Sequence, residues 1–313
     1  MKAQTRTAYQ RPASRRDVDL RLDANEGPRP DSVLRDLVSG LDPEVLRRYP
    51  DATALEARLA QWLDVSPDRV LVTAGADDGI DRCCRMALSQ GGNLIMPRPG
   101  FEMFSRYAEL AGGTVREVEW TSGTLPLNSF ESAIDPDTRA IAVISPNNPT
   151  GLTGTRDQVE ALARRAPDAL IIVDRAYAEF EDEDLDSLSI EMPNVVTLRS
   201  FSKAWGLAGL RVGYAVGPAD LITRLRSSGP PYAVSGVSLA FAGASLESGE
   251  PAMREHVERV RRERIALAEE LSMLGAEPTP SQANFVLARV ADSTRVWEDL
   301  QALGIAVRQW TGQ

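Results

Sequence analysis

Short apolar runs alternate with longer amphipathic segments through most of this 313-residue chain. The runs have the length of strands, and the segments between them repeat apolar residues every three or four positions. Such alternation predicts an α/β fold in which helices cover both faces of a mostly parallel sheet. Strands are expected at 70–72, 94–96, 141–145, 170–173, 195–198 and 211–216. Helices are expected at 32–41, 53–63, 101–111, 155–165 and 251–274, and a further helix is expected to begin at residue 77.

Polar residues and glycines follow several of these strands. Ligands of open α/β sheets bind beyond the carboxyl ends of the strands. Gly75, Asn148, Asp174 and Lys203 all come after predicted strands, so we expect them to converge. The turn at Gly75 also leads into a helix, whose first N–H groups form a cradle for an anion.

Composition excludes several classes of function. A net charge of −10 argues against a nucleic-acid partner, and no apolar run approaches the length of a membrane span. Cys83 and Cys84 are adjacent and are the only cysteines, which favours a reduced, cytoplasmic setting without a disulfide or a metal site. His256, the only histidine, is expected on the polar surface of a helix, so Ser-His-Asp chemistry is not expected.

Lys203 is the most informative single residue. Of 35 lysines and arginines, only Lys2 and Lys203 are lysines. Arg stays protonated, whereas a lysine amine can be neutral and form a Schiff base. Around Lys203 lie Ser200, Ser202 and Arg211, which suit a phosphate. An amine beside a phosphate site suggests pyridoxal phosphate (PLP), although a surface lysine in a glycine-rich loop gives the same pattern.

PLP chemistry also needs a carboxylate at the pyridine nitrogen, a donor to the ring oxygen and a stacking surface. Asp174 ends an apolar strand, where a charge is costly unless it is paired; it could equally cap the next turn. Tyr177 could donate to the ring oxygen or pack, and Phe101 could stack or belong to the core. No glycine motif of a Rossmann oxidoreductase or a P-loop NTPase occurs.

The remaining segments carry less chemistry. The acidic run at 179–186 is expected to be a solvated loop. After the long helix at 251–274 we expect a strand at 284–290, a helix at 294–303 and a strand at 305–308. The long helix itself could pack in the core or connect two domains.

Taken in order, eight stretches of the chain resemble the histidinol-phosphate aminotransferase-like group of class I/II aminotransferases, which are fold-type I PLP enzymes. The stretches lie between Leu22 and Arg308; they are LDANEGP, RRYPD, TAGADDGI, PRPGF, SPNNPTG, IIVDRAYAEF, SFSKAWGLAGLRVGY and SQANFVLAR.

The resemblance implies a role for each matching residue. Lys203 would be the Schiff-base lysine and general acid/base, and Asp174 would pair with the pyridine nitrogen. The other cofactor-binding residues would be Asn148 and Tyr177 at the ring oxygen, Phe101 as the stacking ring, and Ala76, Asp77, Ser200, Ser202 and Arg211 at the phosphate. Tyr49 would reach the neighbouring subunit's phosphate, which implies a homodimer with shared sites. Asn25 and Arg308 would lie on the substrate side.

The sequence departs from the family pattern in three places. Arg175 stands where Glu usually follows the strand-end Asp, and Phe101 stands where Tyr is more common. The family also continues past the strand at Arg308 to an Arg that grips the substrate's anion. The sequence stops before that point, so either the chain is truncated or anion binding has been reassigned.

These inferences predict a large PLP-binding domain at 33–250 and a small α+β domain made of 1–32 and 251–313. The predicted enzyme moves an amino group between histidinol phosphate or an aromatic amino acid and a 2-oxo acid such as 2-oxoglutarate, in amino-acid biosynthesis. Two alternatives stay open. One is a decarboxylase resembling threonine-phosphate decarboxylase, and the other is a catalytically silent PLP-fold partner protein.

Overall fold

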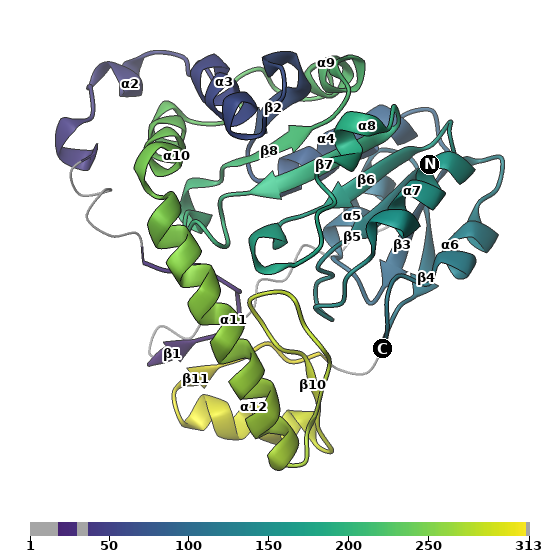
Figure 1. The fold of residues 1–313 in the computed structure, drawn as a ribbon, viewed down its shortest axis with the longest axis vertical. Coiled ribbons are helices and arrows are strands. Elements are labelled where there is room, and N and C mark those ends of the chain that lie inside the picture. Colours follow the sequence, from purple (N-terminus) through teal and green to yellow (C-terminus); the bar gives the residue numbers. More distant parts are fainter. Residues whose placement is uncertain (1–17, 30–36, 311–313) are drawn as a thin grey trace, which may run out of the picture.

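A computed structural model describes residues 18–29 and 37–310 (Figure 1). A sheet covered by helices forms the larger part, and the long helix α11 (Glu250–Met273) runs from it to a smaller group of elements (Figure 1). We call this group the small lobe; it contains β1 (Leu20–Arg21), β9 (Glu277–Pro278), β10 (Ala288–Arg289), α12 (Ser293–Ala302), β11 (Ile305–Ala306) and the end of α11. The expected long helix is therefore confirmed, and it connects the two parts.

The central sheet has seven strands in the order β2-β8-β7-β6-β5-β3-β4. Only β8 runs against its neighbours among these seven, so the expectation of a mostly parallel sheet is confirmed. The strands are β2 (Val70–Thr73), β3 (Asn93–Arg98), β4 (Thr114–Glu119), β5 (Thr138–Ile144), β6 (Leu170–Asp174), β7 (Val195–Ser200) and β8 (Gly213–Val216).

Successive strand residues point to opposite faces of the sheet, which fixes what each face contacts. On β6, Leu170 and Ile172 pack with α4, while Ile171 and Val173 pack on the other face. One face is covered by α4 (Ala76–Leu88), α5 (Met103–Leu110) and α9 (Ala219–Ser227). The other is covered by α3 (Thr53–Trp62), α6 (Leu127–Ala133), α7 (Arg156–Arg165), α8 (Leu188–Glu191) and α10 (Gly236–Ser248).

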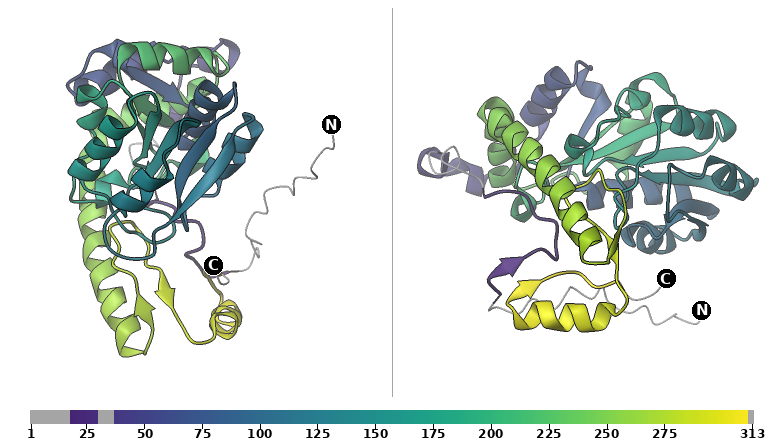
Figure 2. Two further views of the ribbon diagram at one scale, coloured as in Figure 1. Left: turned by 90° about the vertical axis from the view of Figure 1, so that its right-hand side faces the viewer. Right: turned by 60° about the horizontal axis from the view of Figure 1, so that its bottom comes forward.

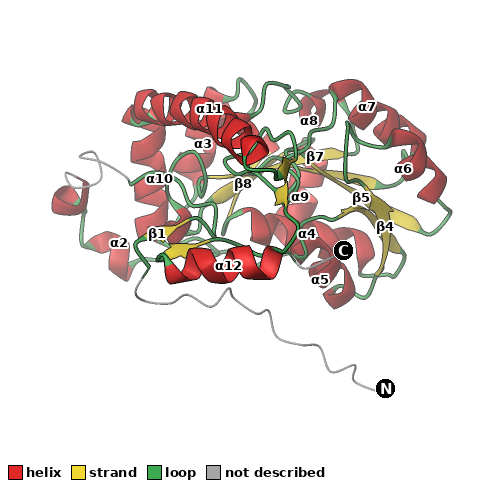
Figure 3. Cartoon of the chain, turned by 90° about the horizontal axis from the view of Figure 1, so that it is seen from below, coloured by secondary structure: helices red, strands yellow, loops and turns green. Residues whose placement is uncertain are grey.

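The small lobe holds two short sheets and α12 (Ser293–Ala302) (Figure 2). The strand β1 (Leu20–Arg21) pairs in parallel with β11 (Ile305–Ala306), and β9 (Glu277–Pro278) pairs with β10 (Ala288–Arg289). Seen from below, α11 and α12 lie on opposite sides of β1 (Figure 3). The small lobe thus joins a segment from before the sheet region to one from after it.

Several expectations about single elements were wrong. The strand expected at 284–290 is reduced to β10. β4, α6, α9 and α10 were not predicted; β4 is an edge strand with mostly exposed residues, so its apolar signal is weak. His256 is half-buried against Phe180 rather than on the surface.

Residues 37–40 are helical, as expected for the helix at 32–41, of which residues 32–36 lie outside the described residues; α2 (Glu44–Arg47) follows. Within 18–29 and 37–310, no helix combines the length and the apolar character needed to cross a membrane. Cys83 and Cys84 are buried, free thiols on α4.

Candidate active site

The ends of β6 and β7 bring two of the predicted cofactor residues, Asp174 and Ser200, to one face of the sheet. Asp174 continues the alternation of Leu170 and Ile172, so it faces α4. Ser200 continues the alternation of Val196 and Leu198 and faces the same way. The site therefore lies at the carboxyl ends of these strands, next to the N-terminus of α4.

Lys203 lies where the sheet region meets the N-terminal segment of the small lobe. Its Nζ donates to Ala24 O at 3.3 Å and lies 5.3 Å from the centroid of the Tyr177 ring. The Asn25 amide donates to the Tyr177 hydroxyl at 3.3 Å, and the Asn284 amide donates to Asn25 O at 3.2 Å. The predicted residues Lys203, Tyr177 and Asn25 are thus brought together around one amine.

A close backbone approach explains one glycine in this segment. A Cβ atom on Gly27 would lie 1.9 Å from Lys203 O, so no other residue fits there without moving the chain. Gly27 therefore lets the N-terminal segment press against the loop that carries the lysine.

Asp174 is a buried carboxyl that lacks a counterion within the described chain. Only 5% of its surface is exposed, and its Oδ1 accepts a bond from Ala176 N–H at 3.1 Å. Burial, together with the smaller effect of the Asp77 charge, raises the pKa of Asp174 to about 7, although the hydrogen bond from Ala176 and the charge of Lys203 oppose the rise. A cationic ligand group would lower this cost, because a nearby opposite charge favours the ionised carboxylate.

The N-terminus of α4 and Arg211 form the predicted phosphate cup. Gly75 (φ 80°) precedes Ala76, the first residue of α4, and a Cβ on Gly75 would lie 2.6 Å from the Arg211 guanidinium. Arg211 donates to Ser202 Oγ at 3.3 Å and to the Asp77 carboxylate at 3.1 Å. Ser202 N–H in turn donates to Ser200 Oγ at 3.0 Å. Free helix N–H groups, hydroxyls and a guanidinium are together suited to a dianion.

Asn148 and Phe101 lie on two loops that are bonded to each other. The loop after β5 carries Asn148, which is half-buried, and the neighbouring Asn147 amide donates to Pro99 O at 2.9 Å. Phe101 is half-buried and packs beside the apolar cluster under α4 and α5. The loop after β3 and the loop after β5 thus hold each other at the edge of the site.

Tyr49 and Arg308 make their contacts with residues other than Lys203. The Tyr49 side chain is 81% exposed and stacks on Tyr232, with ring centroids 4.8 Å apart. Arg308 follows β11 and pairs with Glu102 at 3.6 Å. Tyr49 is thus exposed and stacked on Tyr232, and Arg308 is held beside Glu102.

The other face of the sheet holds a buried charge network, which corrects the expectation that 179–186 is a solvated loop. Arg175 pairs with Glu181 at 2.6 Å, and both side chains are almost fully buried. Arg199 pairs with Glu179 at 2.9 Å and with Asp186. Glu179, Glu181 and Asp186 of the acidic run are wholly or partly buried because they neutralise two arginines at the ends of β6 and β7, whereas Asp182 and Asp184 are exposed.

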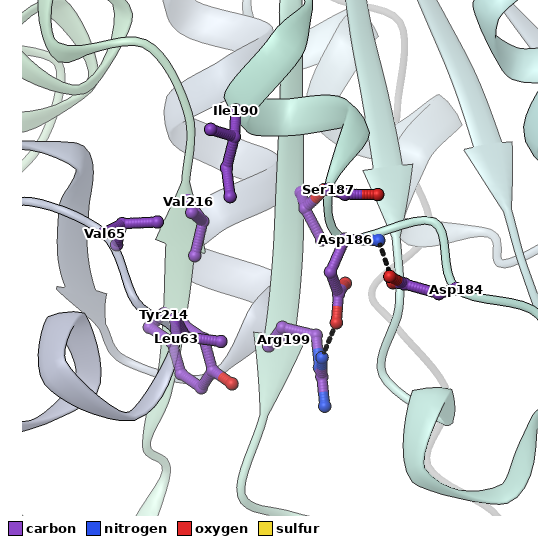
Figure 4. Close-up of a pocket in the computed structure, with 10 residues that line it drawn as sticks. Leu63, Val65, Asp184, Asp186, Ser187, Ile190, Arg199, Tyr214 and Val216 are labelled. Carbon is purple, nitrogen blue, oxygen red and sulfur yellow. Dashed lines mark hydrogen bonds and ion pairs between the residues drawn. The ribbon is translucent and has the colours of Figure 1, made fainter.

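This network borders a cavity of about 160 Å³ (Figure 4). Arg199 and Asp186 are joined across it, and Tyr214 and Val216 of β8 line its wall (Figure 4). Thr197 also lines the cavity, and its buried Oγ1 has no hydrogen-bond partner in the described chain. None of the residues predicted to bind the cofactor lines this cavity.

Comparison with known proteins identifies the family. The family model of class I and II aminotransferases matches residues 19–312, nearly the whole chain. The chain belongs to the class I and II aminotransferases. It is 34% identical to an aromatic amino acid aminotransferase of Corynebacterium jeikeium, over 96% of this chain and 84% of the relative. It is 31% identical to a histidinol-phosphate aminotransferase of Thermoanaerobacter pseudethanolicus, over 93% and 84%.

Solved structures agree with this family and with its cofactor. A histidinol-phosphate aminotransferase of Sinorhizobium meliloti, solved with pyridoxal-5'-phosphate, matches with a TM-score of 0.85 and 25% identity, covering 94% of this chain and 83% of that one. The expectations of a fold-type I aminotransferase and of PLP as its cofactor are confirmed.

The residues present fit this cofactor. The close backbone approach at Gly75 and the uncompensated charge of Asp174 suit its phosphate and its pyridine nitrogen, at the two ends of one site. The sequence did not single out the Ala24 carbonyl or the Asn284 side chain as site groups. Both nevertheless lie in stretches that carry the family resemblance, Ala24 in LDANEGP and Asn284 in SQANFVLAR. It also missed Glu102 and Tyr232, for which the sequence carries no separate signal.

Proposed function

We propose that this aminotransferase moves an amino group from histidinol phosphate or an aromatic amino acid to a 2-oxo acid such as 2-oxoglutarate. The convergence of Lys203, Tyr177 and Asn25 around one amine, opposite the buried Asp174, carries the proposal. The names of relatives that are 34% and 31% identical support these two donors.

The chain's own residues divide the work at the cofactor. Bound PLP supplies an electron sink for the charge left when the substrate loses its α-proton. Asp174 holds the pyridine nitrogen protonated, and Lys203 Nζ takes the α-proton and returns it as a general acid. Asn148 and Tyr177 bond the ring oxygen, and Phe101 covers the ring. The α4 N-terminus at Ala76 and Asp77 binds the phosphate together with Ser200, Ser202 and Arg211.

Substrate binding and assembly involve residues outside this set. Asn25 and Arg308 contact the substrate, and Arg308 binds the anionic group that a substrate such as histidinol phosphate carries at the end away from its amine. Tyr49 reaches the phosphate in the partner subunit of a homodimer, which its 81% exposure supports. The division into a large domain at 33–250 and a small domain at 1–32 and 251–313 fits a substrate that binds between them. Two free, buried cysteines support a cytoplasmic location.

The test is a half-reaction screen of the purified holoenzyme, followed by the absorbance of its cofactor. Histidinol phosphate and aromatic amino acids should convert the bound cofactor to its amine form, and 2-oxoglutarate should restore it. Lys203→Ala should abolish both changes. Release of carbon dioxide without a keto product would instead indicate the decarboxylase, and bound cofactor that no amine converts would indicate a silent partner protein.

A further inference from the structure

Arg308 lies on the edge of the small lobe that faces Lys203. The pairing of β1 with β11 continues to Leu22, whose N–H donates to Ala306 O at 2.8 Å. Two residues further on, Ala24 O accepts from Lys203 Nζ, and Arg308 lies two residues beyond Ala306. The two chains of this small sheet thus lead toward the same site.

Glu102 approaches from the sheet region. It follows Phe101, the residue proposed to cover the cofactor ring, and immediately precedes α5. Its loop is tied to the loop of Asn148 through the bond from Asn147 to Pro99 O. Glu102 is therefore a carboxylate at the border of the proposed site. It belongs to the sheet region, whereas Arg308 belongs to the small lobe.

The contact between Glu102 and Arg308 is loose. The guanidinium and carboxylate atoms lie 3.6 Å apart, which is longer than a hydrogen bond, and both side chains are solvent-accessible. The guanidinium is also held against the Trp310 ring, 4.7 Å from its centroid, so it keeps its position without the carboxylate. An exposed pair of this kind is weak and can be replaced by another anion.

We propose that Glu102 is a specificity-determining residue, which occupies Arg308 in the free enzyme and competes with the anionic group of the substrate. The proposal rests on the proposed function, in which Arg308 binds that group. A substrate with an anionic far end has to displace Glu102, whereas one with an uncharged far end does not. Glu102 therefore weakens binding of the first class relative to the second.

The test measures binding to the holoenzyme rather than turnover. Succinate, an unreactive dicarboxylate, and butyrate, which has the same carbon chain and one carboxylate fewer, are titrated while the cofactor absorbance is followed. Glu102→Gln should lower the Kd for succinate about two- to fivefold and leave butyrate unchanged. Arg308→Gln should raise the Kd for succinate, and the double variant should match Arg308→Gln. Glu277→Gln, which removes the 3.7 Å pair with Arg289 on the same lobe, is the matched control and should change nothing.

Three results would overturn the inference. They are an unchanged or higher Kd for succinate in Glu102→Gln, an effect of Glu102→Gln that persists in the Arg308→Gln background, and a wild-type enzyme that does not bind succinate. Half-transamination can succeed in each of these cases, so the proposed function would then stand while this inference fails.

Discussion

Asp174 and Arg175 are neighbours in the chain but belong to two different electrostatic regions. On the α4 face, Asp174 is buried without a counterion in the described chain. On the other face, Arg175 is buried against Glu181, whose second oxygen accepts from Ser145 Oγ at 2.7 Å. Charges on the second face are neutralised inside the chain, whereas the first face leaves a negative charge for a ligand to neutralise. Buried charge thus stabilises the fold at Arg175 and Glu181, whereas at Asp174 it is available to bind a cationic ligand group.

The largest effect is expected on the face with the paired charges. Arg175→Gln removes the cation and leaves Glu181 buried without it, which should lower the free energy of unfolding by about 3–5 kcal/mol. Burial raises the pKa of Glu181 to about 7, so a protonated Glu181 needs no cation below that pH. The loss measured by urea unfolding should therefore be larger at pH 8 than at pH 6. Glu160→Ala, which breaks an exposed pair with Arg164, should cost less than about 1 kcal/mol; equal losses would contradict the distinction.

The opposite sign is expected at Asp174. Its folded pKa of about 7 lies above the unfolded value, so ionisation destabilises the apoprotein increasingly as the pH rises from about 4 to about 7. Asp174→Asn removes that cost, and the apoprotein should gain about 2–4 kcal/mol at pH 8 and nothing near pH 4. Unfolding of cofactor-free protein at both pH values measures this, and a destabilised variant at pH 8 would show that Asp174 has a structural counterion.

Arg211 sharpens the comparison between the two faces. Its side chain is about half exposed and its pair with Asp77 is accessible to solvent, so Arg211→Gln should change the free energy of unfolding by less than about 1 kcal/mol. The same change removes a guanidinium from the phosphate cup and should raise the Kd for PLP about 10- to 100-fold. Cofactor titration and unfolding of both variants measure the contrast: Arg211→Gln should lose affinity for PLP, whereas Arg175→Gln should lose stability. A large loss of stability in Arg211→Gln would contradict it.

The smallest effect is expected at the cavity beside the charge network. Thr197→Val keeps the side-chain shape and removes a buried hydroxyl without a partner in the described residues, which should stabilise the fold by about 0.5–1 kcal/mol. Thermal unfolding would detect this gain. A loss of more than about 1 kcal/mol would instead indicate an ordered water that bonds Thr197 in the cavity.

Sequence reasoning was most successful where the signal is local. Apolar strand runs and the residues after them, such as Asp174 and Lys203, predicted the parallel sheet and the residues at its carboxyl ends. Reasoning failed where a residue's environment depends on distant partners. The run at 179–186 is charged and looks solvated, yet three of its carboxylates pair with Arg175 and Arg199 and are wholly or partly buried. Likewise, nothing local distinguishes Glu102 from other surface carboxylates before the fold brings Arg308 to it.

The central claim is that the unneutralised charge of Asp174 is completed by the cofactor. The most direct measurement is ¹⁵N NMR of the holoenzyme loaded with PLP labelled at its pyridine nitrogen, at pH 8, for wild type and Asp174→Asn. We predict a protonated nitrogen in the wild type and an unprotonated one in the variant. The same nitrogen signal in both proteins would contradict the pairing of Asp174 with the ring.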